Sequence, residues 1–187
     1  MNRRNALKQL ALASGGIALL PGCNFSPERE QLALDNLQID LKHQDLLAQI
    51  VEMIIPSEKK VAGAETLNLY RFVLVMVDDC EPPEKQQQFV DGLHQLAPFA
   101  KQHLEVAFPS KEAATNEAVL QQAMDLDEHQ LATLPAYASL PTFLTMTKGL
   151  AIQGYLNSKY VLTEHFPYQL VPGSYQGCVS TDGLTVM

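Results

Sequence analysis

The sequence predicts an all-α fold, a small irregular bundle of about five helices followed by a long irregular C-terminal tail. Apolar residues recur at helical spacing along residues 44–56, helix starts that contain proline lie near residues 82–84 and 139–141, and sustained periodicity is lost after Asn157. With 187 residues, 47% of them hydrophobic, the chain is long enough for one globular domain. We divide the chain into a leader, a linker or arm, a helical domain and a tail, at residues 1–22, 23–40, 41–157 and 158–187.

The N-terminus carries a predicted export leader. Arg3 and Arg4 precede the apolar stretch Leu10–Leu20, which is too short for a membrane-spanning helix and is typical of the apolar region of a signal peptide. The paired arginines, followed by Leu7 and Lys8, resemble the twin-arginine motif of proteins that fold before they cross a bacterial membrane. An ordinary secretory leader that starts with two arginines is the alternative.

The end of the leader, Leu20-Pro21-Gly22-Cys23, resembles a bacterial lipobox. In that case Cys23 would be lipidated and become the new N-terminus, and plain cleavage nearby is the alternative. One acyl chain binds a membrane only marginally, so firm anchoring would need more chains or a membrane-bound partner.

The first predicted helix covers QDLLAQIVEMII and is stopped by Pro56. The second extends from Thr66 to Asp79. Its apolar run Phe72–Val77 would allow a strand, but its length favours a helix, and that helix should be buried centrally or covered by another chain. The acidic pair Asp78-Asp79 at its end is expected to be hydrated, which limits the cost against the helix dipole.

The third predicted helix starts at Pro82-Pro83-Glu84 and has Phe89, Leu93 and Leu96 on its inner face. It should break or kink at Pro98 and continue to Phe108-Pro109.

A fourth helix is expected over Ala113–Met124, with a short segment at 128–134. In the last helix Ser139 is the predicted cap and Pro141 lies in the first turn. Its inner face should hold Phe143, Thr147, Leu150 and Gly154.

The chain shows no motif of an enzyme that acts by itself. The nucleotide-binding motifs G-x-G-x-x-G and the P-loop are missing, as are G-x-S-x-G, H-E-x-x-H and the paired E-x-x-H motifs of di-iron bundles. The five histidines are scattered, and surface or capping roles are expected for them. We therefore predict no catalytic, cofactor-binding or metal site. The formal charge of −8 argues against nucleic acid or an anionic membrane surface as a partner.

Besides Cys23, the chain has two cysteines, Cys80 and Cys178. If the leader works, both lie in an oxidising compartment, where disulfides persist. They could pair with each other, or Cys178 could bond to a partner chain. No C-x-x-C motif indicates a redox dithiol or a zinc site.

Two segments together resemble the gluconate 2-dehydrogenase subunit 3 family. In IVEMIIPSEKKVAGAETLNLYRFVLVMVDDCEPPEKQQQFVDGLHQL, a helix ends in I-I-P, a loop contains G-A, and the next helix ends in D-C before a P-P-E helix start. In FLTMTKGLAIQGYLNSKYVLTEHFPYQLVPGSYQGCV, a helix with G-Y leads to V-P-G-x-Y-x-G. The sequence departs from the family pattern at Ser57–Lys60 and at Leu156, which leaves the substrate open, and residues 97–134 match only loosely.

The resemblance implies a non-catalytic accessory subunit of a periplasmic, FAD-dependent dehydrogenase of the glucose-methanol-choline type, acting on a sugar, polyol or aldonate. It implies that FAD, with iron–sulfur and c-type haem groups as further candidates, is held by partner subunits and that this chain has no cofactor. The partners would be a large FAD-dependent subunit, a membrane-bound multihaem cytochrome c and the twin-arginine translocase. The small subunit would escort the large one, which has no leader. It would then lie in the periplasm, attached to the inner membrane by its partner or a lipid. A self-standing exported lipoprotein is the alternative, and an autonomous enzyme a third reading.

The tail is the best candidate for the partner-docking surface. Aromatic residues, prolines and glycines without a sustained period are suited to grooves on another protein. Wrapping of the tail around its own bundle is the alternative. The candidate docking residues are Tyr155, Tyr160, Phe166, Tyr168, Pro172, Gly173, Tyr175 and Gly177.

Overall fold

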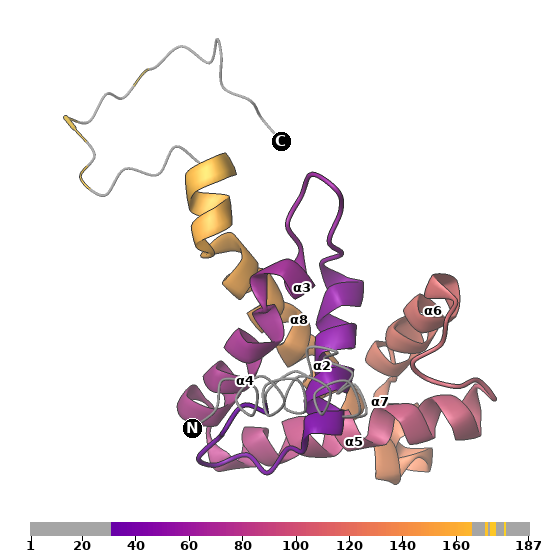
Figure 1. Cartoon of the computed structure of the whole chain (residues 1–187). Coiled ribbons are helices and arrows are strands. Elements are labelled where there is room, and N and C mark those ends of the chain that lie inside the picture. The colour runs from indigo at the N-terminus through magenta and orange to yellow at the C-terminus, as the bar shows by residue number, and fades with distance from the viewer. Residues whose placement is uncertain (1–30, 166–170, 172, 175–177, 179–187) are drawn as a thin grey trace, which may run out of the picture. The chain divides into compact units, whose positions relative to one another are not determined.

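The computed structural model describes residues 31–165, 171, 173, 174 and 178. These described residues form helices and connecting loops without any strand, which confirms the all-α class (Figure 1). The helices are α2 (Leu41–Ile54), α3 (Ala64–Leu67), α4 (Leu69–Cys80), α5 (Pro83–His103), α6 (Ala113–Met124), α7 (Glu128–Thr133), η1 (Pro135–Tyr137), α8 (Leu140–Leu156) and η2 (Val161–His165).

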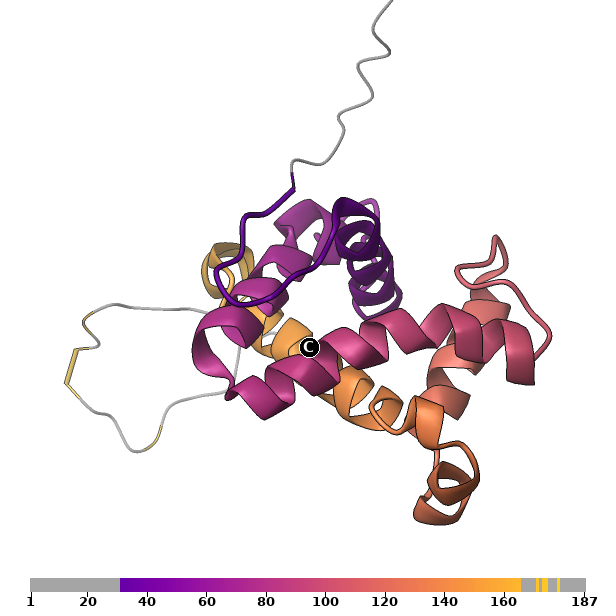
Figure 2. The same cartoon turned by 90° about the horizontal axis from the view of Figure 1, so that it is seen from below.

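Helix α8 packs against α2, α4, α5 and α6, and its largest interface is with α5, which it crosses (Figure 2). The close crossing depends on Gly92 of α5, because a Cβ atom built there would lie 2.3 Å from Cβ of Phe143. Beside it, the rings of Phe89 and Phe143 meet edge to face with their centroids 5.1 Å apart. The predicted inner faces of both helices are confirmed here, since Phe89, Leu93 and Phe143 are completely buried.

The second predicted helix is helical, as expected, but it is divided into α3 and α4 at Asn68. This residue has the left-handed φ of 52° and caps α3, its N–H donating to the carbonyls of Ala64 and Glu65. Asparagine adopts this conformation more readily than most residues, so it supplies the break that the apolar pattern concealed.

Helix α5 runs through Pro98 without a break, so of the two predicted alternatives, a break or a kink, the break is wrong. Pro98 removes one intrahelical hydrogen bond, but Pro98 and His94, one turn before it, are exposed, so water can satisfy the freed carbonyl. The helix ends at His103 rather than near Phe108. Glu105 has a φ of 55°, and the N–H of Val106 donates to the carbonyl of Ala100 at 3.2 Å, which closes the C-terminus.

The other predicted helices are confirmed, and the C-terminal boundary is corrected. α6 has the predicted bounds Ala113–Met124, and α7 occupies the predicted short segment. The helical pattern was expected to end after Asn157, but Val161–His165 forms a turn of π-helix with Val161 buried. Ser139 precedes α8 as predicted, without a capping hydrogen bond from its side chain.

Candidate functional site

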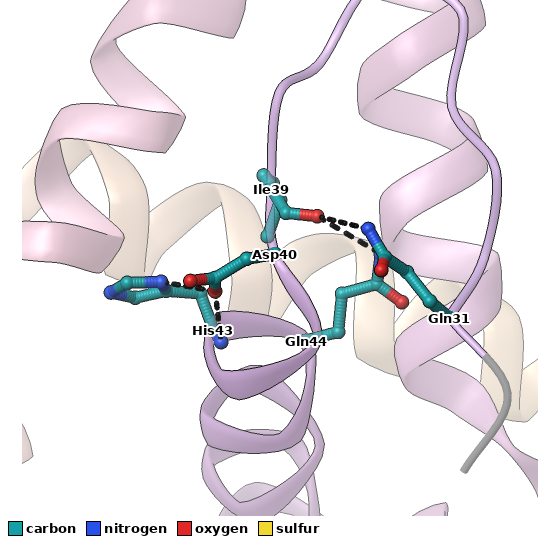
Figure 3. A network of polar contacts seen from close by, with 5 residues as sticks. All are labelled: Gln31, Ile39, Asp40, His43 and Gln44. Carbon is teal, nitrogen blue, oxygen red and sulfur yellow. Dashed lines mark hydrogen bonds and ion pairs between the residues drawn. The ribbon is translucent and has the colours of Figure 1, made fainter.

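The N-terminal arm, residues 31–40, has no regular secondary structure but is bound firmly to the bundle. Leu37 and Ile39 are 6% and 4% exposed and belong to the core. Gln44 on α2 accepts a hydrogen bond from the N–H of Leu32 at 2.9 Å and donates to the carbonyls of Leu32 and Ile39 (Figure 3 shows Gln44 and Gln31 directed toward Ile39). The arm is therefore held on α2 by both apolar burial and hydrogen bonds.

Asp78, at the end of α4, fastens the same arm. Its carboxylate accepts backbone N–H groups from Asp35 at 2.8 Å, Asn36 at 2.8 Å and Leu37 at 2.7 Å. Burial would raise the pKa of Asp78, but these three amides outweigh it and hold the pKa below the ordinary value. The expectation of a hydrated acidic pair is wrong for Asp78, which is 4% exposed, and right for its exposed neighbour Asp79.

Two histidines distant in sequence meet between α2 and α5. The ring centroids of His43 and His94 lie 4.2 Å apart, and Nδ1 of His43 lies 2.6 Å from Oδ1 of Asp40 (Figure 3). Burial and the neighbouring His43 lower the pKa of His94, while Asp40 and Asp91 act in the opposite direction. Asp40 also caps α2 by accepting the N–H of His43 at 2.9 Å.

The described part of the chain offers little else for chemistry. Within it, no group of three or more histidine, cysteine, aspartate or glutamate side chains is placed to hold a metal ion. None of its helices is both long and apolar enough to cross a membrane. His103 packs between Phe99 and Tyr137, which is a structural contact.

The apolar residues left in solvent lie mainly on α4 and α8. Val75 of α4 is 41% exposed, and Ile152 and Leu156 of α8 are 41% and 48% exposed. The two helices touch nearby, because a Cβ atom built on Gly154 would lie 2.6 Å from the ring of Phe72, which is itself half-buried. Helix α4 is thus not buried on all sides, and its outer face is open to a partner.

Three predicted docking residues lie among the described residues, one near the end of α8 and two in the tail. Tyr155 is half-buried against the core, and Tyr160 is half-buried with its ring 4.9 Å from that of His165. Gly173 is exposed, as is Val171, whose side chain is 83% exposed. The other predicted docking residues lie outside the described residues: Phe166, Tyr168, Pro172, Tyr175 and Gly177.

The remaining predicted site residues belong to the leader or are cysteines. Arg3, Arg4, Leu7, Lys8 and Cys23 all lie outside the described residues. Cys80 and Cys178 are exposed and not bonded to each other, so pairing between them, or with a partner, remains a prediction.

An all-helical protein with apolar helix faces open to solvent has the character of a subunit built to meet another chain. The sequence model of the family described as gluconate 2-dehydrogenase subunit 3 matches residues 42–173, and the chain belongs to that family. It is therefore a subunit of a dehydrogenase complex. Neither a curated protein nor a solved structure matched the sequence.

Docking was predicted for the tail and for Tyr155, and the exposed apolar residues Ile152 and Leu156 of α8 were not among the predicted residues. The available indication was the helix sequence LPTFLTMTKGLAIQGYL, in which Lys148 is the only charged residue. A helix that lies on a bundle surface normally presents several charges to water.

Proposed function

We propose that this chain is the non-catalytic small subunit of a periplasmic, FAD-dependent sugar, polyol or aldonate dehydrogenase, and that it escorts the flavoprotein subunit through the twin-arginine route. FAD, and any iron–sulfur or haem c group, is then held by partner subunits. The proposal rests on the family match over residues 42–173 and on the leader-like sequence around Arg3 and Arg4. Flavoproteins that bind their cofactor in the cytoplasm must cross the membrane folded, so one leader serves both chains.

One structural observation favours docking by the tail over wrapping of the tail around its own bundle. Val171, in the V-P-G motif, is 83% exposed, and Gly173 and Ser174 beside it are also exposed. An apolar side chain in a motif shared with the family gains free energy if a partner covers it, at about 25 cal/mol per Å² of apolar surface. The motif therefore supports contact with the flavoprotein subunit.

The escort role is tested by replacing Arg3 and Arg4 with lysine in the cells that produce the complex. Dehydrogenase activity should leave the periplasmic fraction and accumulate in the cytoplasm, while Arg29→Lys, which lies beyond the leader, leaves the distribution unchanged. Undiminished periplasmic activity in the Arg3→Lys/Arg4→Lys strain would contradict the escort role.

Docking by the tail is tested by purifying a tagged chain from the same cells. The wild-type chain should carry a yellow flavoprotein, and Val171→Asp should carry at least tenfold less, with Ser174→Asp as the neighbouring control. A wild-type chain that carries no flavoprotein would support the self-standing lipoprotein instead.

A further inference from the structure

The outer face of α8 carries a regular stripe of uncharged residues. The spacing of its members alternates between three and four residues, which places them on one side of the helix, as in the contact positions of a coiled coil. We call this stripe the α8 seam, and its members are Thr142, Thr145, Gly149, Ile152 and Leu156. Thr142 is half-buried and the other four are exposed.

The opposite side of α8 is already used by the bundle. Phe143, Thr147 and Ala151 are buried against the neighbouring helices. Helix α8 is therefore uncharged on both sides, with Lys148 as its only charged residue. A helix of this composition is typical of one that is covered all round, and in the described structure nothing covers the α8 seam.

The shape of the α8 seam suits a second helix. A Cβ atom built on Gly149, at the middle of the seam, meets nothing within 4 Å, so a partner backbone can approach closely there. Ile152 and Leu156 provide larger apolar side chains toward one end. Three seam residues, Thr142, Thr145 and Gly149, themselves line a hollow of about 510 Å³. Its other walls include Met146, Leu150 and the ion-paired Glu81 and Lys85, and it has room for side chains of the partner.

The charges favour a different chain over a second copy of this one. In a symmetric pair of α8 helices in register at Gly149, the two Lys148 ammonium groups would approach each other, and each chain carries a formal charge of −8. Within residues 31–165, Lys148 has no ion pair. A partner helix that places a carboxylate near Lys148 would supply the ion pair that this residue does not make within residues 31–165.

We propose that the α8 seam docks one α-helix of the flavoprotein subunit, about four turns long, with apolar residues facing Ile152 and Leu156 and an acidic residue facing Lys148. Four turns match the seam, which spans about 21 Å at 1.5 Å per residue. This inference rests on the proposed function, since it takes the flavoprotein as partner.

The experiment compares tagged variants of the full chain by the amount of flavoprotein that each one carries. Ile152→Asp and Thr145→Arg should each carry at least tenfold less than wild type, because each places a desolvated charge in the seam. Lys148→Glu should lose a similar factor, because it faces an acidic residue. Val61→Asp is the control, since Val61 is 37% exposed and lies in the loop between α2 and α3 rather than in the seam. Circular dichroism of each variant checks that it has folded, as expected for exposed positions.

The outcomes separate this inference from the proposed function. If wild type carries the flavoprotein and Ile152→Asp and Thr145→Arg carry equal amounts, the α8 seam is not the interface and the inference fails alone. If wild type carries none, the proposed function fails and the inference fails with it. If size-exclusion chromatography shows a wild-type dimer that Ile152→Asp dissociates, the occupant is a second copy, which also overturns the inference.

Discussion

Oδ1 of Asp78 accepts a hydrogen bond from the backbone N–H of Leu37 at 2.7 Å, across 41 residues of sequence. The contact ties the C-terminal end of α4 to the arm that precedes α2. The same carboxylate accepts two further amides, so its removal affects three donors together, one of which is the N–H of the buried Leu37.

Replacement of Asp78 by alanine should lower the free energy of unfolding by about 3 kcal/mol. The estimate follows from the loss of hydrogen bonds to a charged acceptor, which leaves amide donors without partners. Urea titration followed by circular dichroism measures it. Asp79→Ala is the matched control, because Asp79 is exposed and adjacent, and its effect should stay within about 0.5 kcal/mol. Equal effects of the two substitutions would show that the arm contact contributes nothing.

The same contact should give an acid-dependent stability. The pKa of Asp78 is lower in the folded chain than its ordinary value of 3.8, so the unfolded chain binds the proton more tightly. The stabilisation is therefore fully present above about pH 5 and is lost as the pH falls through the folded pKa. The difference in unfolding free energy between wild type and Asp78→Asn should shrink between pH 5 and pH 2 in urea titrations. A difference that stays constant over this range would contradict the assignment.

Asp78 and Asp79 show a feature of the fold that the sequence alone did not predict, namely which of two adjacent aspartates is buried. The two residues are identical and adjacent, and the periodicity of α4 does not distinguish them. One is buried because the arm, which has no period of its own, folds back onto it. By contrast, the bounds of α6 follow from local pattern alone and were predicted correctly at both ends. Local pattern thus predicts helices, whereas long-range contacts decide which polar residues are buried.

The candidate interface was predictable only in part. The tail motif around Val171 stands out by its composition, and its docking role is still a prediction. The α8 seam could not be predicted from the sequence. In a helix with almost no charged residues, helical periodicity does not distinguish the side that the bundle covers from the side that faces solvent. Only the packing of Phe143 against α5 shows that the side with Ile152 is left open.

Two glycines should respond oppositely to alanine. A Cβ atom at Gly92 would lie 2.3 Å from Cβ of Phe143, so Gly92→Ala should destabilise the chain by about 1–3 kcal/mol through overpacking at the α5–α8 crossing. Gly149 lies within α8 with open space around it, so Gly149→Ala should stabilise the isolated chain by up to about 1 kcal/mol. Thermal unfolding of both variants beside wild type measures the two shifts. Shifts of the same sign would contradict the packing described at one of the two positions.

Thr147 should tolerate the loss of its hydroxyl. Its Oγ1 is buried on α8 and has no hydrogen-bond partner in the described structure. Valine has the same shape without the polar atom, so Thr147→Val should raise the free energy of unfolding by about 1 kcal/mol. Urea titration tests this, with Thr145→Val as the exposed control. A clear loss of stability would mean that the hydroxyl has a partner, such as a buried water molecule.

Because the rings of His43 and His94 are in contact, replacing His43 should shift the pKa of His94. The pKa of His94 is lowered by burial and by the neighbouring His43, and it is raised by Asp40 and Asp91. Replacement of His43 by glutamine removes one of the two lowering influences and leaves both carboxylates, so the pKa of His94 should rise. Nuclear magnetic resonance of the ring protons against pH measures it. His103→Gln is the matched control, because His103 stacks on Phe99 elsewhere on the same helix. An unchanged His94 titration in His43→Gln would show that the two rings are not in contact in solution.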